Sequence, residues 1–127
     1  MCGAHLSGLP LNPQLVGLGG RLRQRARTAG GYRLYRLPGA GVPRPGLVRT
    51  GDGPPGGIAV EVWQLPHQAV GALLGMVPAP LGLGPVELDD GSTVTSFLVP
   101  AEDVSTAEDV SAFGGWRGFL ADSSRAE

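Results

Sequence analysis

Clusters of glycine and proline divide this chain into short segments. The densest clusters lie at residues 17–20, 38–46, 51–57 and 78–84, and the 127 residues include 22 glycines and 12 prolines. A share above one quarter is typical of disordered chains, but the apolar residues between the clusters are patterned rather than scattered. We therefore expect tight turns between short strands, in one domain with a modest core. The expected domain spans residues 1–120, followed by a disordered tail at 121–127.

The clearest strand is IAVEVWQL at residues 58–65. Both of its alternating faces are largely apolar, which predicts a central strand covered on two sides. Glu61 lies within it. A buried carboxylate is costly unless it is paired or functional, so Glu61 is a candidate functional residue.

A second pattern is the basic segment RLRQRART at residues 21–28, followed by YRLYRL at 32–37. Arginines recur with period two, which places them on one face of a strand. Two such segments separated by AGG predict a β-hairpin with an arginine-lined face. The alternative is a basic helix that binds RNA, but strict alternation argues against it.

The remaining segments predict short elements around these strands. They are a helical turn at 13–17, a strand at 47–50, a helix at 66–77 with Val70, Leu73, Leu74 and Val77 on one face, a hairpin at 85–99 turning at Asp90-Gly91, and a short closing helix anchored by Trp116, Phe119 and Leu120. The total is five or six strands and two or three helices. This predicts a small mixed α+β fold, mostly antiparallel, arranged as a closed or partly closed barrel.

Charge is unevenly distributed along the chain. Residues 1–51 contain eight arginines and no acid, whereas residues 52–127 contain two arginines and all eleven acids. The net charge of −1 favours internal pairing or anion binding over nucleic-acid binding. The absence of lysine excludes Schiff-base chemistry, a P-loop and lysine-dependent amidase catalysis.

Other composition limits are equally direct. Cys2 is the single cysteine, so no internal disulfide or cysteine-rich metal site is possible. His5 and His67 are the two histidines and lack metal-ligand spacing, so we expect no metal and no cofactor, with His67 on the surface. The sequence has no apolar run of membrane-spanning length and no recognisable signal peptide. We expect a cytoplasmic protein that contacts neither membrane nor nucleic acid.

The opening stretch GAHLSG, residues 3–8, predicts a loop rich in glycine. Its backbone N–H groups are suited to holding an anion, and His5 is suited to acid–base chemistry near neutral pH. The alternative is a histidine that is simply hydrogen-bonded within a turn. Ser7 does not lie in a G-x-S-x-G motif, which argues against a serine nucleophile.

Six blocks taken together resemble the C-terminal domain of allophanate hydrolase. They are GAHLSGLPLN, TAGGYRLYRLP, PRPGLVR, VEVWQLP, PAPLGLGPVELDDGSTVTSFL and EDVSAFGGWRGFL, and they span residues 3–120 in the family's order. The resemblance implies a fold like that of gamma-glutamylcyclotransferases, a small mixed barrel. It also implies a role in urea degradation: decarboxylation of N-carboxycarbamate, the product of the family's separate amidase domain, and help with enzyme assembly.

The resemblance makes His5 the residue expected to matter in the substrate loop. The assigned catalytic residues are His5, as proton donor to the departing nitrogen, and Glu61, which orients His5 or pairs with an arginine. The assigned substrate-binding residues are Gly3, Ala4, Leu6, Ser7, Asn12, Arg33, Tyr35 and Arg49.

Two departures from the family pattern shape the functional hypotheses. The chain lacks an amidase domain, so hydrolysis of allophanate by this chain alone is not expected. The family has an apolar strand before GAHLSG, of which only Met1 and Cys2 stand here, and we expect low stability for this reason. The first hypothesis is a domain that binds a small anionic carbamate or carboxylate and assists its decarboxylation. The alternatives are a non-catalytic module that binds an amidase or forms a homo-oligomer, and a truncated remnant.

Overall fold

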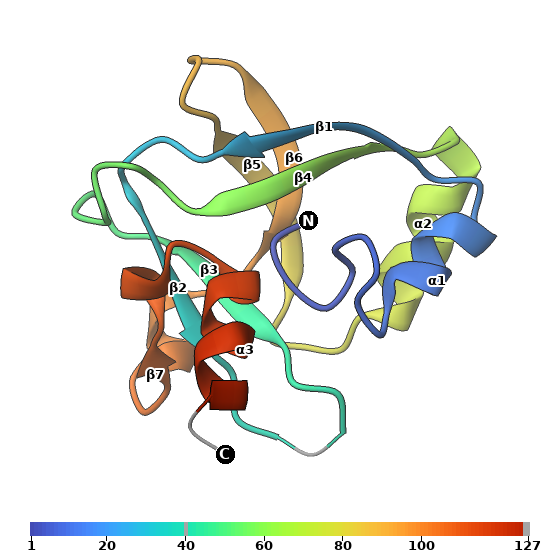
Figure 1. Ribbon diagram of the computed structural model, residues 1–127. Helices are drawn as coiled ribbons and strands as arrows, with labels where there is room; N and C mark the ends of the chain where they lie inside the picture. Colours follow the sequence, from blue (N-terminus) through green and yellow to red (C-terminus); the bar gives the residue numbers. More distant parts are fainter. Residues whose placement is uncertain (40, 126–127) are drawn as a thin grey trace.

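The computed structural model describes residues 1–39 and 41–125 as short strands and helices around a shared core (Figure 1). The strands are β1 (Arg21–Arg27), β2 (Tyr32–Arg36), β3 (Pro45–Arg49), β4 (Ala59–Gln64), β5 (Gly82–Glu87), β6 (Thr93–Leu98) and β7 (Glu108–Asp109). The α-helices are α1 (Asn12–Gly17), α2 (His67–Met76) and α3 (Trp116–Arg125), and two 3₁₀ turns are η1 (Ala101–Val104) and η2 (Ser111–Phe113). The small mixed α+β architecture with antiparallel strands is confirmed.

The strands form three separate antiparallel sheets, with the orders β1-β4, β3-β2-β7 and β5-β6. The predicted hairpin between β1 and β2 is therefore wrong. The half-buried residues of β1 find apolar partners on β4, with Leu22 opposite Trp63 and Ala26 opposite Val60. Such cross-strand pairs stabilise a sheet, and they direct β1 to a strand far along the sequence.

The sheets are joined at their ends but do not close into a barrel among the described residues. Ala29 N–H donates to Glu87 O and Asp89 N–H donates to Arg27 O, both at 2.9 Å, which links β1 to β5. Val99 N–H donates to Leu47 O at 3.0 Å and links β6 to β3. The expectation that β4 is a central strand is also wrong. Among the described residues, β4 has a full-length partner strand, β1, on one edge only.

The core lies between these sheets and the C-terminal helix. Leu34, Leu47, Ile58 and Val110 are completely buried, and Trp116 is 1% exposed. The rings of Trp116 and Phe119 pack with centroids 5.0 Å apart, which confirms the predicted anchoring of the closing helix. The anchored turn continues as α3 to Arg125, whereas a disordered tail was expected from residue 121. Residues 126–127 of that tail lie outside the described residues.

The helix α2 confirms the predicted helix at 66–77, with Pro66 immediately before its first residue. Leu73 and Val77 are buried, but Leu74 is 44% exposed because α2 lies at the rim and buries only a narrow stripe. Among the described residues, no helix is long and apolar enough to cross a membrane.

We predict that Trp116→Ala lowers the free energy of unfolding by about 3–5 kcal/mol, because it empties a buried aromatic site. Phe113→Ala is the matched control, since Phe113 is 39% exposed and meets Phe119 edge to face. The control should cost less than about 1.5 kcal/mol. Urea denaturation followed by circular dichroism measures both, and equal losses would contradict the anchoring role of Trp116.

Candidate functional site

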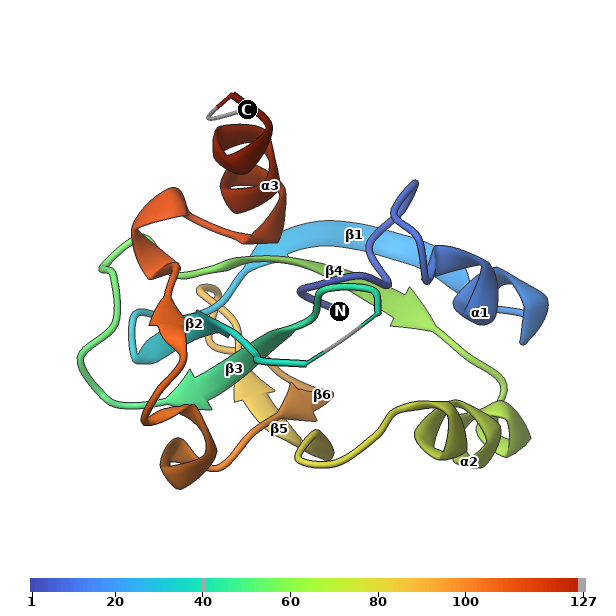
Figure 2. The same cartoon turned by 90° about the horizontal axis from the view of Figure 1, so that it is seen from below.

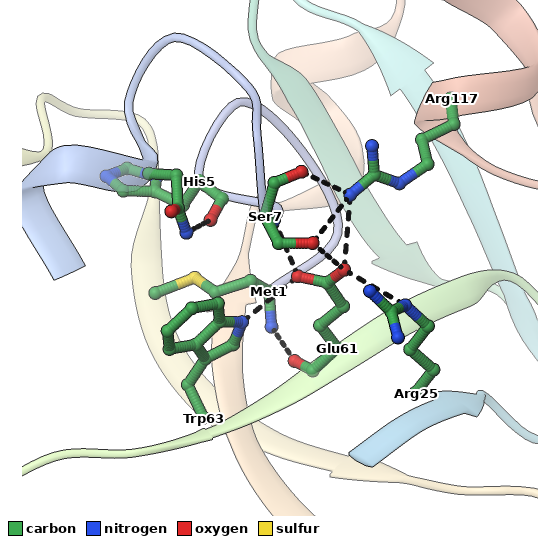
Figure 3. Close-up of polar contacts among 8 residues, drawn as sticks. Met1, His5, Ser7, Arg25, Glu61, Trp63 and Arg117 are labelled. Atoms are coloured by element: carbon green, nitrogen blue, oxygen red, sulfur yellow. Dashed lines mark hydrogen bonds and ion pairs between the residues drawn. The ribbon is translucent and has the colours of Figure 1, made fainter. Parts of the chain in front are cut away.

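The best-satisfied polar group of the described residues is the carboxylate of Glu61, which is 3% exposed on β4. Ser7 donates to it twice, from its backbone N–H to Oε1 at 2.7 Å and from its hydroxyl to Oε2 at 2.8 Å. The indole N–H of Trp63 donates to Oε1 at 3.1 Å. Figure 3 shows these groups converging on the carboxylate from the N-terminal loop and from β4.

Two arginines complete the surroundings of Glu61. An Nη of Arg117, on α3, donates to Oε2 at 3.2 Å, and Nε of Arg25, on β1, lies 3.7 Å from the same oxygen. Burial by itself raises the pKa of Glu61, but the hydrogen bonds from Ser7, Trp63 and Arg117 outweigh it and hold the pKa below its usual value. The carboxylate is therefore ionised at neutral pH and has no proton to donate.

The loop that carries Ser7 is fixed from both ends. The same Arg117 nitrogen donates to the backbone oxygen of Ser7 at 2.5 Å and to its hydroxyl at 3.1 Å. Gly3 packs directly on Pro45, and a Cβ at Gly3 would lie 2.4 Å from two ring carbons of that proline. A residue larger than glycine does not fit there, which explains why the loop begins with glycine.

His5 lies on the other side of the loop. Its ring points away from Glu61 (Figure 3), and its Nε2 lies 2.6 Å from the side-chain oxygen of Gln14. The Asn12 amide donates to the backbone oxygen of His5 at 3.0 Å. Burial lowers the pKa of His5; the hydrogen bond with Gln14 opposes this shift, and the positive charge of Arg44 adds to it. His5 is therefore neutral at pH 7 in this state.

Arg44 is a residue that sequence reasoning missed. One of its terminal nitrogens, Nη1, is buried and has no hydrogen-bond partner among the described residues. Arg44 and His5 both line a cavity of about 30 Å³. Arg44 and Leu81 also line an outer cavity of about 440 Å³, so these two side chains form the wall between the two spaces. A buried polar atom without a hydrogen-bond partner is uncommon in folded proteins, and a guanidinium N–H is well suited to hydrogen-bond an anion.

The only sequence signal for Arg44 was its position in the block PRPGLVR, because an arginine between two prolines has no periodicity to place it. The structure draws attention to Arg44 through the burial of its Nη1, which the sequence cannot give.

Some of the other predicted site residues lie near Glu61 or near His5, and the rest lie elsewhere in the fold. Ala4 and Leu6 are buried, and Leu6 lines a cavity of about 680 Å³ beside Arg25, Arg27 and Arg117. The structure brings Ser7 to Glu61 and Asn12 to His5, but it does not bring Glu61 to His5.

Arg33, Tyr35 and Arg49 lie on β2 and β3, in a different sheet from Glu61. Arg33 is engaged by acids, at 3.2 Å from Asp52 and 2.8 Å from Asp109. No hydrogen bond or ion pair joins these three predicted residues to His5 or Glu61 in the described part of the chain. Nor do three His, Cys, Asp or Glu side chains of that part gather as a metal site would need.

The loop, the buried glutamate and the C-terminal arginine come from the start, the middle and the end of the chain, and one family model covers all three. The family model described as "Allophanate hydrolase C-terminal domain" matches residues 1–121. The chain belongs to this family.

Larger proteins contain similar domains. The urea amidolyase of Saccharomyces cerevisiae is 38% identical over 121 residues, which cover 93% of this chain and 7% of the yeast protein. A crystal structure of Kluyveromyces lactis allophanate hydrolase superposes with a TM-score of 0.89 at 38% identity, covering 95% of this chain and 20% of that one. This chain thus spans a small fraction of these relatives.

A third relative is close to this domain in size. The structure of c4763, described as a uropathogenic E. coli-specific protein, has a TM-score of 0.85 and 32% identity. The match covers 94% of this chain and 91% of that one. The allophanate hydrolase C-terminal domain fold therefore also occurs in a solved chain of comparable length.

We predict that Glu61→Gln lowers the free energy of unfolding at pH 7 by about 1–3 kcal/mol, because the neutral amide cannot replace the bonds of the carboxylate. The pKa of Glu61 is lowered in the folded protein, so its contribution is complete above its unfolded pKa and is lost as pH falls toward the folded value. In the Glu61→Gln variant, this part of the acid-induced decrease in the free energy of unfolding should be absent.

Urea denaturation from pH 7 down to pH 3 tests this, with Glu87→Gln as control because Glu87 is exposed on β5. The control should stay within about 0.5 kcal/mol of the parent at pH 7. Identical pH profiles for the parent and Glu61→Gln would show that the buried carboxylate does not act as described.

Proposed function

We propose that this domain binds a small carboxylate or carbamate anion beside His5 and Arg44, and that it assists the decarboxylation of N-carboxycarbamate in urea degradation. The observation that supports this most strongly is the buried Nη1 of Arg44, which has no partner among the described residues and shares a cavity with His5. A guanidinium recognises a carboxylate with charge-assisted hydrogen bonds. The names of the yeast relatives agree with this substrate class.

The inner cavity of about 30 Å³ is the size of one water molecule, so a dicarboxylate would enter from the outer cavity. Arg44 stands in the wall between the two spaces. In this proposal the Arg44 side chain rotates when the anion enters. Its Nη1, which has no partner among the described residues, then forms an ion pair with the anion. The glycine-rich loop supplies backbone N–H groups around the same space.

The proposed chemistry requires one proton. Loss of CO₂ from N-carboxycarbamate breaks a C–N bond, leaves the electron pair on nitrogen and gives carbamate once that nitrogen is protonated. His5 is neutral before binding, but a bound dianion would raise its pKa by favouring the charged imidazolium. His5 would then take up a proton on binding and deliver it to the nitrogen as CO₂ leaves. Glu61 acts at a distance by holding the loop through Ser7.

We predict that malonate, which replaces the nitrogen of N-carboxycarbamate with a methylene group, binds to this protein. Arg44→Gln should weaken binding by about tenfold or more, because a charge-assisted pair is lost. Arg36→Gln is the control, since Arg36 is exposed at the end of β2. Isothermal titration calorimetry measures all three, and equal affinities for the two variants would reject Arg44 as the anion-binding residue.

We also predict a proton linkage. The pKa of His5 is lowered in the free protein and raised by the dianion, so malonate affinity should rise as pH falls from the bound pKa to the free pKa. Calorimetry in buffers of different ionisation enthalpy should detect proton uptake by the parent and none by His5→Gln.

The catalytic role is tested by CO₂ release. A separate amidase acting on allophanate supplies N-carboxycarbamate, and His5→Gln should lower the domain-dependent rate by about 10²-fold. A rate unchanged by adding the parent protein would reject the catalytic function while leaving anion binding intact.

We propose in addition that the fold is an opened form of the small barrel of gamma-glutamylcyclotransferase-like proteins. The links from β1 to β5 and from β6 to β3 support this, because they continue backbone hydrogen bonding around one side of the core.

A second candidate function is assembly with an amidase. Arg21 and Arg23 on β1 are exposed, and neither forms an ion pair with an acid of the described residues, so this surface is suited to an acidic partner. Size-exclusion chromatography with and without an amidase-signature protein tests it, with Arg21→Gln/Arg23→Gln as the variant. A monomer that ignores the partner rejects this function.

A further inference from the structure

The ring of His5 has one hydrogen-bond partner among the described residues, the side chain of Gln14. Nε2 of His5 lies 2.6 Å from Oε1 of Gln14. A side-chain amide oxygen accepts hydrogen bonds and cannot donate them, so Nε2 must carry the ring proton that makes this bond. In a neutral imidazole one nitrogen is a donor and the other is an acceptor. The lone pair of neutral His5 is therefore on Nδ1.

The other ring nitrogen, Nδ1, forms no hydrogen bond within residues 1–39 and 41–125. Of the side-chain polar atoms in this part of the chain, Arg44 Nη1 is the one that is both fully buried and without a partner. Nδ1 of His5 has no partner either, so it retains some accessible surface. His5 also lines the cavity of about 30 Å³ that it shares with Arg44. The ring nitrogen that is able to accept a proton is thus the one that remains open to a ligand.

The place of Gln14 is fixed by its neighbours in α1. Leu15, the next residue, is completely buried and belongs to a core cluster shared with α2 and β6. The amide of Asn12, the first residue of α1, donates to the backbone oxygen of His5 at 3.0 Å. Figure 2, like Figure 1, shows α1 beside the N-terminal loop at one end of the β1–β4 sheet. One short helix therefore holds both the backbone and the ring of His5.

We propose that Gln14 is a positioning residue that keeps the proton of neutral His5 on Nε2, and that Nδ1 is the atom that exchanges a proton with the bound ligand. The tautomer of a histidine is set by the hydrogen bond that one of its ring nitrogens makes. This inference rests on the proposed function of His5, and it adds the reacting atom and the residue that selects this atom.

The proton balance of the proposed step follows from this assignment. When the dianion binds, Nδ1 takes up one proton and the ring becomes an imidazolium with N–H groups on both nitrogens. As the C–N bond breaks, its electron pair stays on the ligand nitrogen, which receives the proton from Nδ1. The products are CO₂, carbamate and neutral His5, whose Nε2 has kept its hydrogen bond to Gln14 throughout.

The uncharged amide of Gln14 suits a histidine that changes charge when a ligand binds. Burial, the Arg44 guanidinium and the amino terminus of Met1 all lower the pKa of His5, whereas the hydrogen bond with Gln14 raises it. A carboxylate at position 14 would stabilise the imidazolium before any ligand is present. The amide oxygen accepts the Nε2 proton in both charge states, so the ligand decides whether the ring is charged.

Long-range ¹H–¹⁵N NMR correlations of the histidine rings in the full chain test the tautomer without a ligand. At about pH 8, above the ordinary pKa of histidine, we expect His5 to carry its proton on Nε2, protected from exchange by the hydrogen bond. His67 is exposed at the start of α2 and should show no protected ring proton. A ring proton on Nδ1 of His5 would overturn the proposal whether or not malonate binds.

Two substitutions at position 14 separate positioning from a general effect on the fold. Gln14→Leu removes the acceptor, so it should abolish the protection of the ring proton and lower the rate of CO₂ release at least about tenfold. Gln14→Glu keeps an acceptor and should retain the protection, but it raises the pKa of His5 and should reduce proton uptake on malonate binding at pH 7. Gln68→Leu, on the exposed side of α2, is the control and should change none of these.

The outcomes distinguish this proposal from the proposed function. In the parent protein, saturating malonate should add a second ring proton, on Nδ1. Equal protection of the ring proton in the parent and Gln14→Leu would overturn the role of Gln14, as would unchanged proton uptake in Gln14→Glu. A parent protein that binds no malonate would reject the proposed function and the proton exchange with a ligand, even where the ligand-free spectra place the proton on Nε2.

Discussion

The arrangement of this domain depends on one buried carboxylate. Glu61 sits inside β4, where an ion without partners would be prohibitively costly, and four segments meet it: the N-terminal loop through Ser7, β4 itself through Trp63, β1 through Arg25 and α3 through Arg117. Each segment is short. The need to satisfy one charge therefore brings together parts of the chain that are far apart in the sequence.

The loop held by this carboxylate has two faces of different character. On the Ser7 face every close polar group has a partner, which suits a structural role. On the His5 face a buried guanidinium nitrogen of Arg44 has none among the described residues. The structural contacts lie on the Ser7 side of the loop, and the proposed anion site lies on the His5 side, where hydrogen bonding is incomplete.

Local patterns in the sequence predicted much of the fold but only part of the site. Apolar alternation around Glu61 identified β4, and the Asp90-Gly91 turn identified the β5–β6 hairpin. Period-two arginines identified β1 as a strand but not its partner, because an alternating strand pairs equally well with any suitable edge. Ser7 and Arg117 are separated from Glu61 by 54 and 56 positions, and no spacing rule reaches so far. Arg33 was misleading for the converse reason, because its acidic partners Asp52 and Asp109 lie in distant segments.

The closed network at Glu61 joins the N-terminal loop to β4 through Ser7, so the central question is how firmly Glu61 holds this loop. Hydrogen exchange of the Ser7 amide, which donates to Glu61 at 2.7 Å, measures this most directly. The account predicts that this amide exchanges only through an opening close in free energy to global unfolding, and that Glu61→Gln accelerates it beyond the general loss of stability. A Ser7 amide that exchanges in the native protein as fast as in an unstructured peptide would contradict it.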